Sequence, residues 1–395
     1  MRGRRWIALL AAGALALVAC DWSQPRFGPG RAGFNPFETV VGAGNVARLA
    51  PAWSASLPSR GSDVVVIDGV VIAAVSGVSG GPGSVVARDA ATGAPRWSQS
   101  YPGAGCRPVG CFSPSVSLAA ADGAVYVAIT FTTTGGLFSY DADTGTPIRS
   151  YTSASTWGPA VADGRLYASV YSGTTGIGAW DVATGTPVFG SNELGGVSSL
   201  PVAVGGGRVY DVRNGMLRAF DASGVAGCAG TPAVCTPLWT APAVGAPAVA
   251  GEVVVAGDQV FAAAGCGAAT CAPIWTADAG GPVSPAAVAG GVLYVTSFDR
   301  LLAFDAAGCG APACPPLWAA DDAGFWAPSV ANGVVYTADG DRLNAYPAGG
   351  CSGPACPALA SLPLPAEAGT GSVVVSGGRV HLALADGTLL AMAVA

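Results

Sequence analysis

A repeated segment is the feature that most constrains how this chain folds. From residue 47 onward, Gly-x-Val/Leu-Tyr is followed by an apolar-aromatic-Asp stretch, a tight turn and a stretch that often carries Trp. Two copies read DGRLYASVYSGTTGIGAWDVATGTPVFG and GGVLYVTSFDRLLAFDAAGCGAPACPPLWAA. The pieces are short, alternate in apolar character and lie between Gly-rich turns, which is typical of antiparallel strands.

The spacing of the repeat predicts the architecture. Sets of three strands begin near residues 61, 113, 158, 199, 246, 284, 327 and 370, about 38 to 52 residues apart. A period near 40 residues with four strands in each unit predicts an all-β fold, an eight-bladed β-propeller whose blades each have four antiparallel strands.

The fourth strands predict how the ring closes. Only seven follow the eight sets, centred on Trp97, Ile148, Phe189, Trp239, Trp275, Trp318 and Leu359. A matching stretch, APAWSASLP, lies upstream around Trp53. We therefore expect the N-terminal strand to close the ring by completing the blade of residues 370–395.

Three turns share the sequence Asp-x-x-Thr-Gly and begin at Asp89, Asp141 and Asp181. An Asp side chain at this place accepts hydrogen bonds from backbone N–H groups, and Gly adopts positive φ without strain. Carboxylates can also act as catalytic acids. The recurrence at one turn favours the structural role.

The N-terminus carries an export signal. MRGRR is basic, WIALLAAGALALVA is apolar, and Leu17-Val18-Ala19-Cys20 resembles the lipobox of bacterial lipoproteins. That resemblance implies a lipoprotein signal peptide over residues 1–19 and a lipid on Cys20. An ordinary secretion signal and a membrane anchor are the alternatives, although this apolar run is shorter than the roughly 20 residues of a membrane span. The Arg4-Arg5 pair also permits the twin-arginine export route.

Charge limits the partners of the exported chain. Without residues 1–19 the chain has 15 Arg, no Lys and 24 acidic residues, a formal charge of −9. Nucleic acid is therefore not expected as a partner, because phosphate binding needs concentrated basic surface. Residues 20–46 are rich in Gly, Pro and polar residues, so we expect a loose tether between the lipid and a propeller of residues 47–395.

Ten further cysteines form five local pairs, most with four residues between them. Zinc knuckles usually have two-residue spacing and join two pairs in space. An exported compartment permits disulfides, so we predict five local bonds, with a redox-active pair as the alternative. The pairs are Cys106/Cys111, Cys228/Cys235, Cys266/Cys271, Cys309/Cys314 and Cys351/Cys356.

The repeat Gly-x-Val-Tyr…Leu-x-Ala-Phe/Trp-Asp-Ala-x-Thr-Gly…Trp resembles the pyrroloquinoline quinone (PQQ)-binding-like, or quinoprotein-like, propeller family over residues 47–395. The lipobox and the single-domain length are most similar to its BamB-type lipoprotein branch. The resemblance implies the propeller fold. It does not by itself imply a function.

The enzymes of that family typically have adjacent disulfide-bonded cysteines, a calcium bound by Glu, Asn and Asp, and an Asp base. This chain has no Cys-Cys, no Cys-x-x-Cys-His haem motif and a single His, His381, which we expect to be an ordinary strand residue. We therefore predict no catalytic residue, metal or cofactor. PQQ with calcium is the alternative.

One group of residues remains as a candidate binding site. Trp157 (TWGPAV) and Trp326 (FWAPSV) occupy the same repeat position in blades three and seven, so they should face each other across one channel mouth. Phe112 (CFSPSV) lies near the same repeat position in blade two, and Arg107, Asp321 and Asp322 are expected in adjoining loops on that face. Paired aromatic side chains can clamp a planar ligand or a partner side chain, and they can also simply pack between blades.

These observations predict a lipid-anchored envelope protein, in the periplasm or on the cell surface, that acts without catalysis as a binding or scaffold protein for an envelope partner. The alternative is a protein that binds a small ligand or PQQ at the Trp-lined mouth. A polysaccharide-binding propeller is a third hypothesis, suggested only by the Trp residues.

Overall fold

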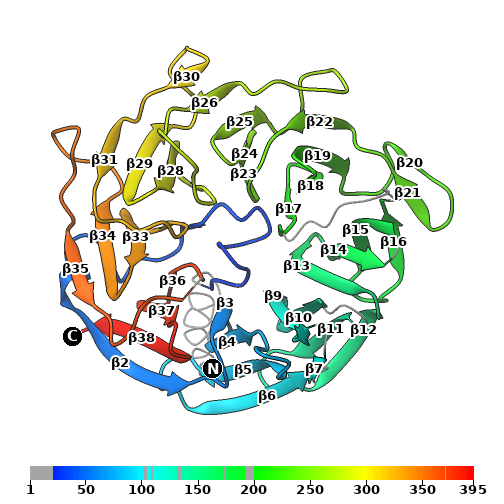
Figure 1. Cartoon of the computed structure of the whole chain (residues 1–395), viewed down its shortest axis with the longest axis horizontal. Coiled ribbons are helices and arrows are strands. Elements are labelled where there is room, and N and C mark those ends of the chain that lie inside the picture. The colour runs from blue at the N-terminus through cyan, green and yellow to red at the C-terminus, as the bar shows by residue number, and fades with distance from the viewer. Residues whose placement is uncertain are drawn as a thin grey trace, which may run out of the picture.

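The computed structural model describes residues 21–101, 105–107, 110–130, 135–172, 174–191, 200–369 and 371–395. They form a ring of eight four-stranded antiparallel sheets around a central channel (Figure 1). The predicted eight-bladed propeller is therefore confirmed. The strands of each blade are numbered from the channel outward. The first strand faces the channel and the fourth strand forms the perimeter.

The strands of blades 1 to 4 have the following bounds. Blade 1 contains β3 (Gly61–Ile67), β4 (Val70–Val75), β5 (Gly83–Asp89) and β6 (Pro95–Tyr101). Blade 2 contains β9 (Ser115–Ala121), β10 (Ala124–Thr130), β11 (Gly136–Asp141) and β12 (Pro147–Thr152). Blade 3 contains β13 (Ser155–Ala162), β14 (Arg165–Ser172), β15 (Thr174–Asp181) and β16 (Pro187–Gly190). Blade 4 contains β17 (Ala203–Gly205), β18 (Arg208–Arg213), β19 (Met216–Asp221) and β22 (Trp239–Pro242).

The remaining blades complete the ring. Blade 5 contains β23 (Pro247–Ala250), β24 (Val253–Ala256), β25 (Gln259–Ala262) and β26 (Trp275–Ala277). Blade 6 contains β27 (Ala287–Ala289), β28 (Val292–Ser297), β29 (Arg300–Asp305) and β31 (Trp318–Ala320). Blade 7 contains β32 (Ser329–Ala331), β33 (Val334–Asp339), β34 (Arg342–Pro347) and β35 (Ala360–Pro363). Blade 8 contains β36 (Val374–Ser376), β37 (Arg379–Ala383), β38 (Thr388–Val394) and β2 (Leu49–Ser56).

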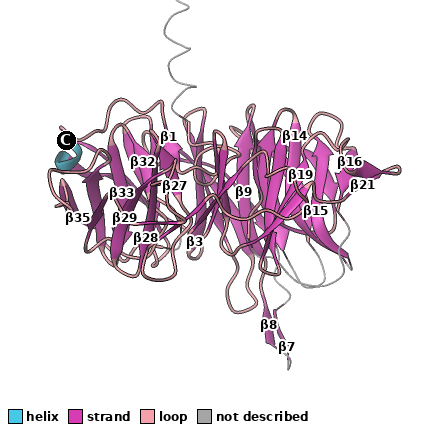
Figure 2. Cartoon of the chain, turned by 90° about the horizontal axis from the view of Figure 1, so that it is seen from above, coloured by secondary structure: helices cyan, strands magenta, loops and turns pink. Residues whose placement is uncertain are grey.

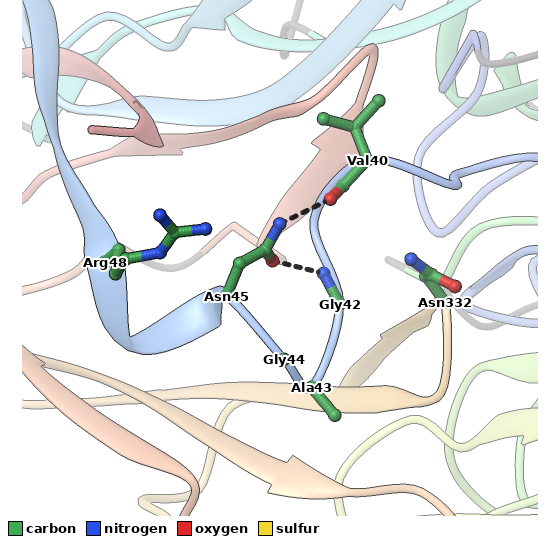
Figure 3. A pocket seen from close by; sticks show the side chains of 7 residues that line it. All are labelled: Val40, Gly42, Ala43, Gly44, Asn45, Arg48 and Asn332. Carbon is green, nitrogen blue, oxygen red and sulfur yellow. Dashed lines mark hydrogen bonds between the residues drawn. The ribbon is translucent and has the colours of Figure 1, made fainter.

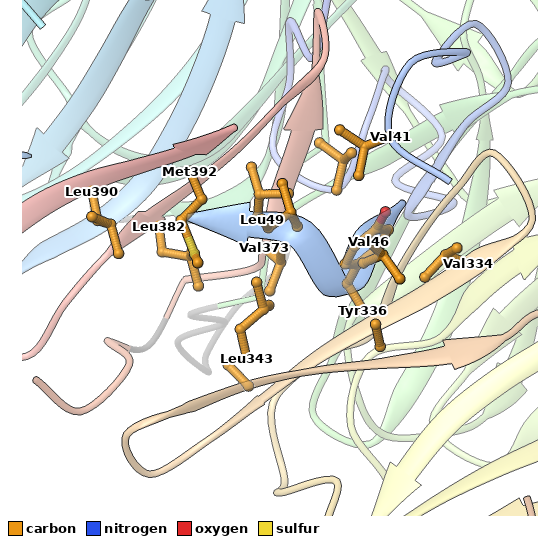
Figure 4. Packing of buried hydrophobic residues seen from close by; sticks show 14 of the residues in the cluster. Val41, Val46, Leu49, Val334, Tyr336, Leu343, Val373, Leu382, Leu390 and Met392 are labelled. Carbon is orange, nitrogen blue, oxygen red and sulfur yellow. The ribbon is translucent and has the colours of Figure 1, made fainter. Parts of the chain in front are cut away.

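The N-terminal strand closes the ring, as predicted. β2 pairs antiparallel with β38 from Leu49 opposite Val394 to Ser56 opposite Thr388. Just before it, the short 3-10 helix η2 (Val46–Arg48) places Val46 in an apolar cluster with side chains of blades 7 and 8 (Figure 4). The turn that leads into η2 is held by Asn45, which donates to the Val40 carbonyl at 2.8 Å and accepts from Gly42 N–H at 2.8 Å (Figure 3).

The turns define two faces of the disc. The turns after the first and third strands of each blade lie on one face, here called the turn face. The other connections lie on the opposite face, here called the mouth face. The ribbon of β7 (Gly105–Arg107) and β8 (Gly110–Phe112) projects from the mouth face (Figure 2).

The Asp-x-x-Thr-Gly turns have the predicted structural role. Asp89 Oδ1 accepts hydrogen bonds from Thr92 N–H at 2.9 Å and Thr92 Oγ1–H at 2.8 Å. Asp141 and Asp181 bind the corresponding Thr in the same way. The Gly that ends the turn packs against a fourth-strand side chain of the preceding blade, which is Trp53 at Gly93, Trp97 at Gly145 and Arg149 at Gly185.

Two fourth-strand positions differ from the prediction by one residue. In blade 2, Arg149 packs against Gly185 and donates to the carbonyls of Thr184 and Ala183, so the predicted centre, Ile148, is wrong. In blade 7, Ala360 pairs with Ala345 just as Trp318 pairs with Ala303, so Leu359 is also one residue early. Ile148 is 52% exposed, because the docking side chains alternate with outward-facing ones.

Residues 22–38, here called the central segment, run through the middle of the ring (Figure 1). In every blade they bind the inner-strand residue two positions before the turn. Backbone N–H groups donate to the central segment in seven blades, at Val66, Ala120, Val161, Val204, Val249, Val288 and Val330. In blade 8, Asn35 Nδ2–H donates to the Val375 carbonyl at 2.8 Å. Within the segment, β1 (Phe34–Asn35) pairs parallel with β32.

The expected loose tether is therefore wrong for residues 21–46. Trp22 is fully buried, and Gln24, Asn35 and Glu38 are buried as well. The inner strands of a propeller present an edge of unpaired backbone groups, and the central segment satisfies part of it. Its Gly and Pro residues serve tight turns rather than flexibility.

Four disulfides are confirmed: Cys228–Cys235, Cys266–Cys271, Cys309–Cys314 and Cys351–Cys356. Each lies in the loop between the third and fourth strands of blades 4 to 7. The fifth predicted pair, Cys106 and Cys111, is opposed in the β7–β8 ribbon, but its side chains lie outside the described residues.

Each disulfide loop extends the preceding blade. β21 (Ala233–Cys235), which also pairs with β20 (Cys228–Ala229), lies parallel to β16 of blade 3. β30 (Ala313–Cys314) lies parallel to β26 of blade 5. Single bridges, Thr240 to Thr270 and Ala319 to Ala355, do the same for blades 4 and 6. Four perimeter strands are thus covered by the next blade. Among the described residues, no helix is long and apolar enough to cross a membrane.

Candidate functional site

A cavity of about 320 Å³ opens on the mouth face where the channel meets the central segment. Trp157 and Trp326 both line it, from opposite blades, together with Phe325. Trp157 lies in β13 directly before a register shift, and Gly158 N–H donates to Ser117 Oγ at 2.9 Å. Trp326 precedes β32 and is 38% exposed. The two Trp residues therefore lie at the same channel mouth, as their shared repeat position predicts.

The central segment supplies the floor of this channel cavity. Pro25, Arg26 and Arg31 line it from below, and Asp63 lines it from β3. Arg26 and Arg31 have φ angles of 63° and 56°, in the left-handed region that costs a non-Gly residue free energy. The two residues with strained backbone are thus the ones that place guanidinium groups in the floor of the cavity.

The floor contains charged groups whose pKa values are shifted by burial. Arg31 donates to the carbonyls of Val202 at 2.6 Å and Pro159 at 2.9 Å. Burial lowers its pKa to about 10, against the opposing effect of Asp63. Burial, and next the charge of Arg31, lower the pKa of Arg26 to about 9, and burial raises the pKa of Asp63. With pKa values of about 9 and 10, the guanidinium groups of Arg26 and Arg31 remain protonated near pH 7.

Arg26 has spare hydrogen-bonding capacity. One Nη donates to the Ala286 carbonyl. Its Nε and other Nη are buried and have no partner, and the residue is only 8% exposed. A buried donor without a partner is costly, so this guanidinium is suited to an acceptor that enters the cavity.

Two of the other predicted mouth residues do not line this cavity. Asp321 and Asp322 line a separate groove beside the Cys351–Cys356 loop, and Asp321 pairs with Arg300 at 3.3 Å. They lie in the loop between β31 and β32, as expected, but they do not line the cavity that the two Trp residues share. Arg107 and Phe112 belong to β7 and β8, and their side chains lie outside the described residues, as does Cys20.

Sequence reasoning missed Arg26 and Arg31. They lie in the segment for which the sequence predicts a loose tether, and no repeat pattern marks them. His381 lies in β37 as predicted and is 1% exposed. Burial, and next the neighbouring Arg379, lower its pKa to about 3, so it is neutral near pH 7. Within the described ranges, no group of three or more His, Cys, Asp or Glu residues is arranged to hold a metal ion.

Solved structures with similar folds include two dehydrogenases and a BamB. A europium-containing methanol dehydrogenase has a TM-score of 0.69 at 14% identity, covering 96% of this chain and 99% of that chain. The quinohemoprotein alcohol dehydrogenase of Comamonas testosteroni has a TM-score of 0.64 at 16% identity, covering 96% and 81%. BamB of Moraxella catarrhalis has a TM-score of 0.55 at 15% identity, covering 87% and 97%. At such identities the likeness shows the fold alone.

The sequence itself places the chain in a family. None of the curated proteins matches it. The family described as outer membrane protein assembly factor BamB matches residues 39–148 and 133–348, which is well over half of the chain. The chain belongs to this family of PQQ-like propellers, the BamB outer membrane protein assembly factor family.

Proposed function

We propose that this protein is an exported, lipid-anchored propeller that binds a partner in the cell envelope and has no catalytic activity of its own. The central segment is the observation that carries this proposal. It fills the channel with the chain's own residues and makes a hydrogen bond to each blade. What remains for other molecules is the two faces, the perimeter and the shallow channel cavity.

The same segment bears on where the proposed anchor would hold the protein. Cys20 immediately precedes Asp21 and Trp22, and Trp22 is buried against β3, where its carbonyl accepts Val66 N–H at 2.9 Å. A lipid on Cys20 would therefore hold the disc close to the membrane rather than at the end of a long tether. Family membership and the four disulfides support an extracytoplasmic site.

Fractionation of cells that express the Cys20→Ser protein tests the anchor. Wild-type protein should be found with the membranes, and the variant should be released or remain unprocessed. Crosslinking in the envelope followed by purification tests partner binding. Membrane association of the variant equal to wild type would refute lipid anchoring, and the absence of any specific crosslinked protein would refute the scaffold role.

A second candidate function is the binding of a small anionic ligand in the channel cavity. The two Trp rings and the unpartnered nitrogens of Arg26 favour it. Calcium takes six to eight oxygen ligands. Among the described residues that line the cavity, Asp63 is the only carboxylate, and it lies beside Arg31. This donor set does not fit calcium-bound PQQ. Addition of PQQ and calcium should accordingly give no saturable binding and no dye reduction.

A further inference from the structure

A second cavity, of about 600 Å³, lies on the turn face between blades 8 and 1, where the ring closes. We call it the seam pocket. Blade 8 contributes Arg379 and His381, blade 1 contributes Asp68, and Asp21 covers it from the start of the described chain. It is far from the Trp-lined mouth, because it opens on the other face of the disc.

The pocket exists at a break in the repeat. In five blades the position of His381 holds Tyr, as in the Gly-x-Val/Leu-Tyr pattern. Tyr167, Tyr210 and Tyr294 reach the next blade and donate to a backbone carbonyl at 2.7 to 2.9 Å. The matching carbonyl, that of Ala90, instead accepts Trp53 Nε1–H at 3.1 Å. The shorter imidazole therefore leaves space at this seam.

The replacement also leaves polar atoms without partners. The Nδ1 of His381 is buried and has no hydrogen-bond partner, and the residue is 1% exposed while lining the pocket. The buried Nε of Arg379 likewise has no partner. In native proteins such groups are usually satisfied, so their presence at a cavity points to a molecule that enters it.

Charged groups of both signs line the pocket without forming ion pairs with each other. Among the described residues, neither Arg379 nor Asp21 nor Asp68 takes part in an ion pair. Asp89 and Arg96, which also line the pocket, are already paired with each other at 2.8 Å. A ligand that bridges the unpaired groups needs an anionic end for Arg379 and a cationic end for the two carboxylates.

We propose that the seam pocket binds a phosphate–ammonium zwitterion of the phosphoethanolamine type. A phosphate has enough acceptor oxygens for the Arg379 guanidinium and for a proton on His381 Nδ1 together. A primary ammonium has three donors for the carboxylates of Asp21 and Asp68. The ligand source is a free metabolite or a lipid headgroup, and only the lipid source rests on the proposed anchor at Cys20.

The single histidine provides a site-specific test, because His381 is the only one in the chain. The full chain is labelled with ¹⁵N-histidine, purified without a histidine tag and titrated with glycerophosphoethanolamine. The imidazole signals should shift saturably. Glycerophosphocholine should bind at least tenfold more weakly, because its trimethylammonium group donates no hydrogen bonds. No saturable shift of the wild-type signal, or equal affinity for both compounds, overturns the proposal.

Variants separate recognition from folding. Arg379→Gln and Asp68→Asn should each weaken binding at least tenfold. Arg208→Gln is the matched control, because Arg208 starts β18 just as Arg379 starts β37 but lies at the blade 4–5 seam. It should keep wild-type affinity, and all three should keep the wild-type unfolding temperature within a few degrees. Equal loss in Arg208→Gln and Arg379→Gln overturns the assignment.

Vesicles distinguish the two sources. Selective sedimentation of wild type, but not of Arg379→Gln, with phosphatidylethanolamine over phosphatidylcholine vesicles supports a headgroup ligand. Binding of the soluble compound without such selectivity supports a free zwitterion. The Cys20→Ser fractionation tests the anchor separately, so failure of the proposed function and failure of the pocket give different results.

Discussion

The indole of Trp97 in blade 1 packs against Gly145 in blade 2, and its Nε1–H donates to the neighbouring Ala142 carbonyl at 2.9 Å. A Cβ added at Gly145 would lie 2.6 Å from the ring. The same contact recurs between Trp53 and Gly93 and between Trp275 and Gly308. These contacts join neighbouring blades along the perimeter.

Gly145→Ala should therefore destabilise the protein more than Gly123→Ala. Both residues have φ near 70°, but an added Cβ at Gly123 meets nothing within 4 Å. The shared backbone strain cancels in the comparison, and the clash with Trp97 should add about 1–3 kcal/mol. Chemical denaturation of the two variants measures the difference, and equal midpoints would contradict the packing argument.

A buried ionic group in blade 4 gives a larger effect. Asp211 accepts Arg218 Nε–H at 2.8 Å and lies 3.8 Å from the Nε of Arg213. Asp211→Asn leaves two buried guanidinium groups without their carboxylate and should reduce the free energy of unfolding by about 3–5 kcal/mol. Asp341→Asn, at an exposed carboxylate, should change it by less than about 0.5 kcal/mol. The argument fails if both variants unfold alike.

The central segment should be sensitive to close approach. A Cβ at Gly30 would lie 2.6 Å from the Val249 carbonyl oxygen, whereas one at Gly44 meets nothing within 4 Å. Gly30→Ala should make residues 22–38 accessible to protease at lower protease concentration and lower the unfolding temperature, because the bond between Gly30 and Val249 is displaced. Gly44→Ala should behave as wild type. Limited proteolysis with mass spectrometry reports both.

His381 should make stability depend on pH. The pKa of His381 is lowered to about 3 in the folded protein, from an unfolded value near 6.5. Between these values the unfolded chain binds a proton that the folded chain does not, so the free energy of unfolding falls as pH falls, by up to about 1.4 kcal/mol per unit. Asp21, with a pKa raised to about 6, acts in the opposite direction over part of this range.

His381→Tyr isolates that effect, because Asp21 is present in both proteins. As pH is lowered from 6.5, wild type should lose more unfolding free energy than His381→Tyr. The difference between the two proteins should therefore grow steadily. Urea denaturation across this range provides the measurement. Parallel curves would mean that the imidazole does not titrate as its burial requires.

Removal of one disulfide tests the covering of the perimeter. The double variant Cys309→Ser, Cys314→Ser should lose about 2 kcal/mol, as expected when so short a loop is no longer closed. Since β30 pairs with β26, hydrogen exchange should also increase at Thr276, whose N–H donates to the Pro312 carbonyl at 2.8 Å. Exchange at blade 1, which carries no such loop, is the internal control.

The repeat determined how much of the fold could be predicted. Blade number, closure by the strand around Trp53 and the role of Asp89 all followed from period and turn chemistry. Ile148 and Leu359 were each assigned one residue early, because without Trp an alternating strand gives no sign of which residue docks. The central segment could not be predicted, since most of its bonds to the blades use backbone groups that every sequence possesses, and the side-chain bonds of Gln24 and Asn35 belong to no repeat.

The site was predictable to the same degree. Trp157 and Trp326 share a repeat position, and rotational symmetry brings such positions to one mouth. Arg26 and Arg31 belong to no repeat, so only three-dimensional structure joins them to the Trp pair. His381 was recognised as a strand residue. In most blades a Tyr at this position reaches the next blade. The consequence of having no Tyr that reaches Ala90 could be inferred only from the three-dimensional arrangement of the seam.

The closure of the ring makes the order of synthesis matter. Translation produces the central segment and β2 long before it produces blade 8, yet Leu49 pairs with Val394 and Asn35 binds Val375. Until blade 8 has been synthesised, β2 and Asn35 therefore lack these partners. A chain interrupted in its last blade is left with open β-edges, which mark it for degradation or aggregation. Closure of the ring thus requires a chain that has been synthesised through blade 8.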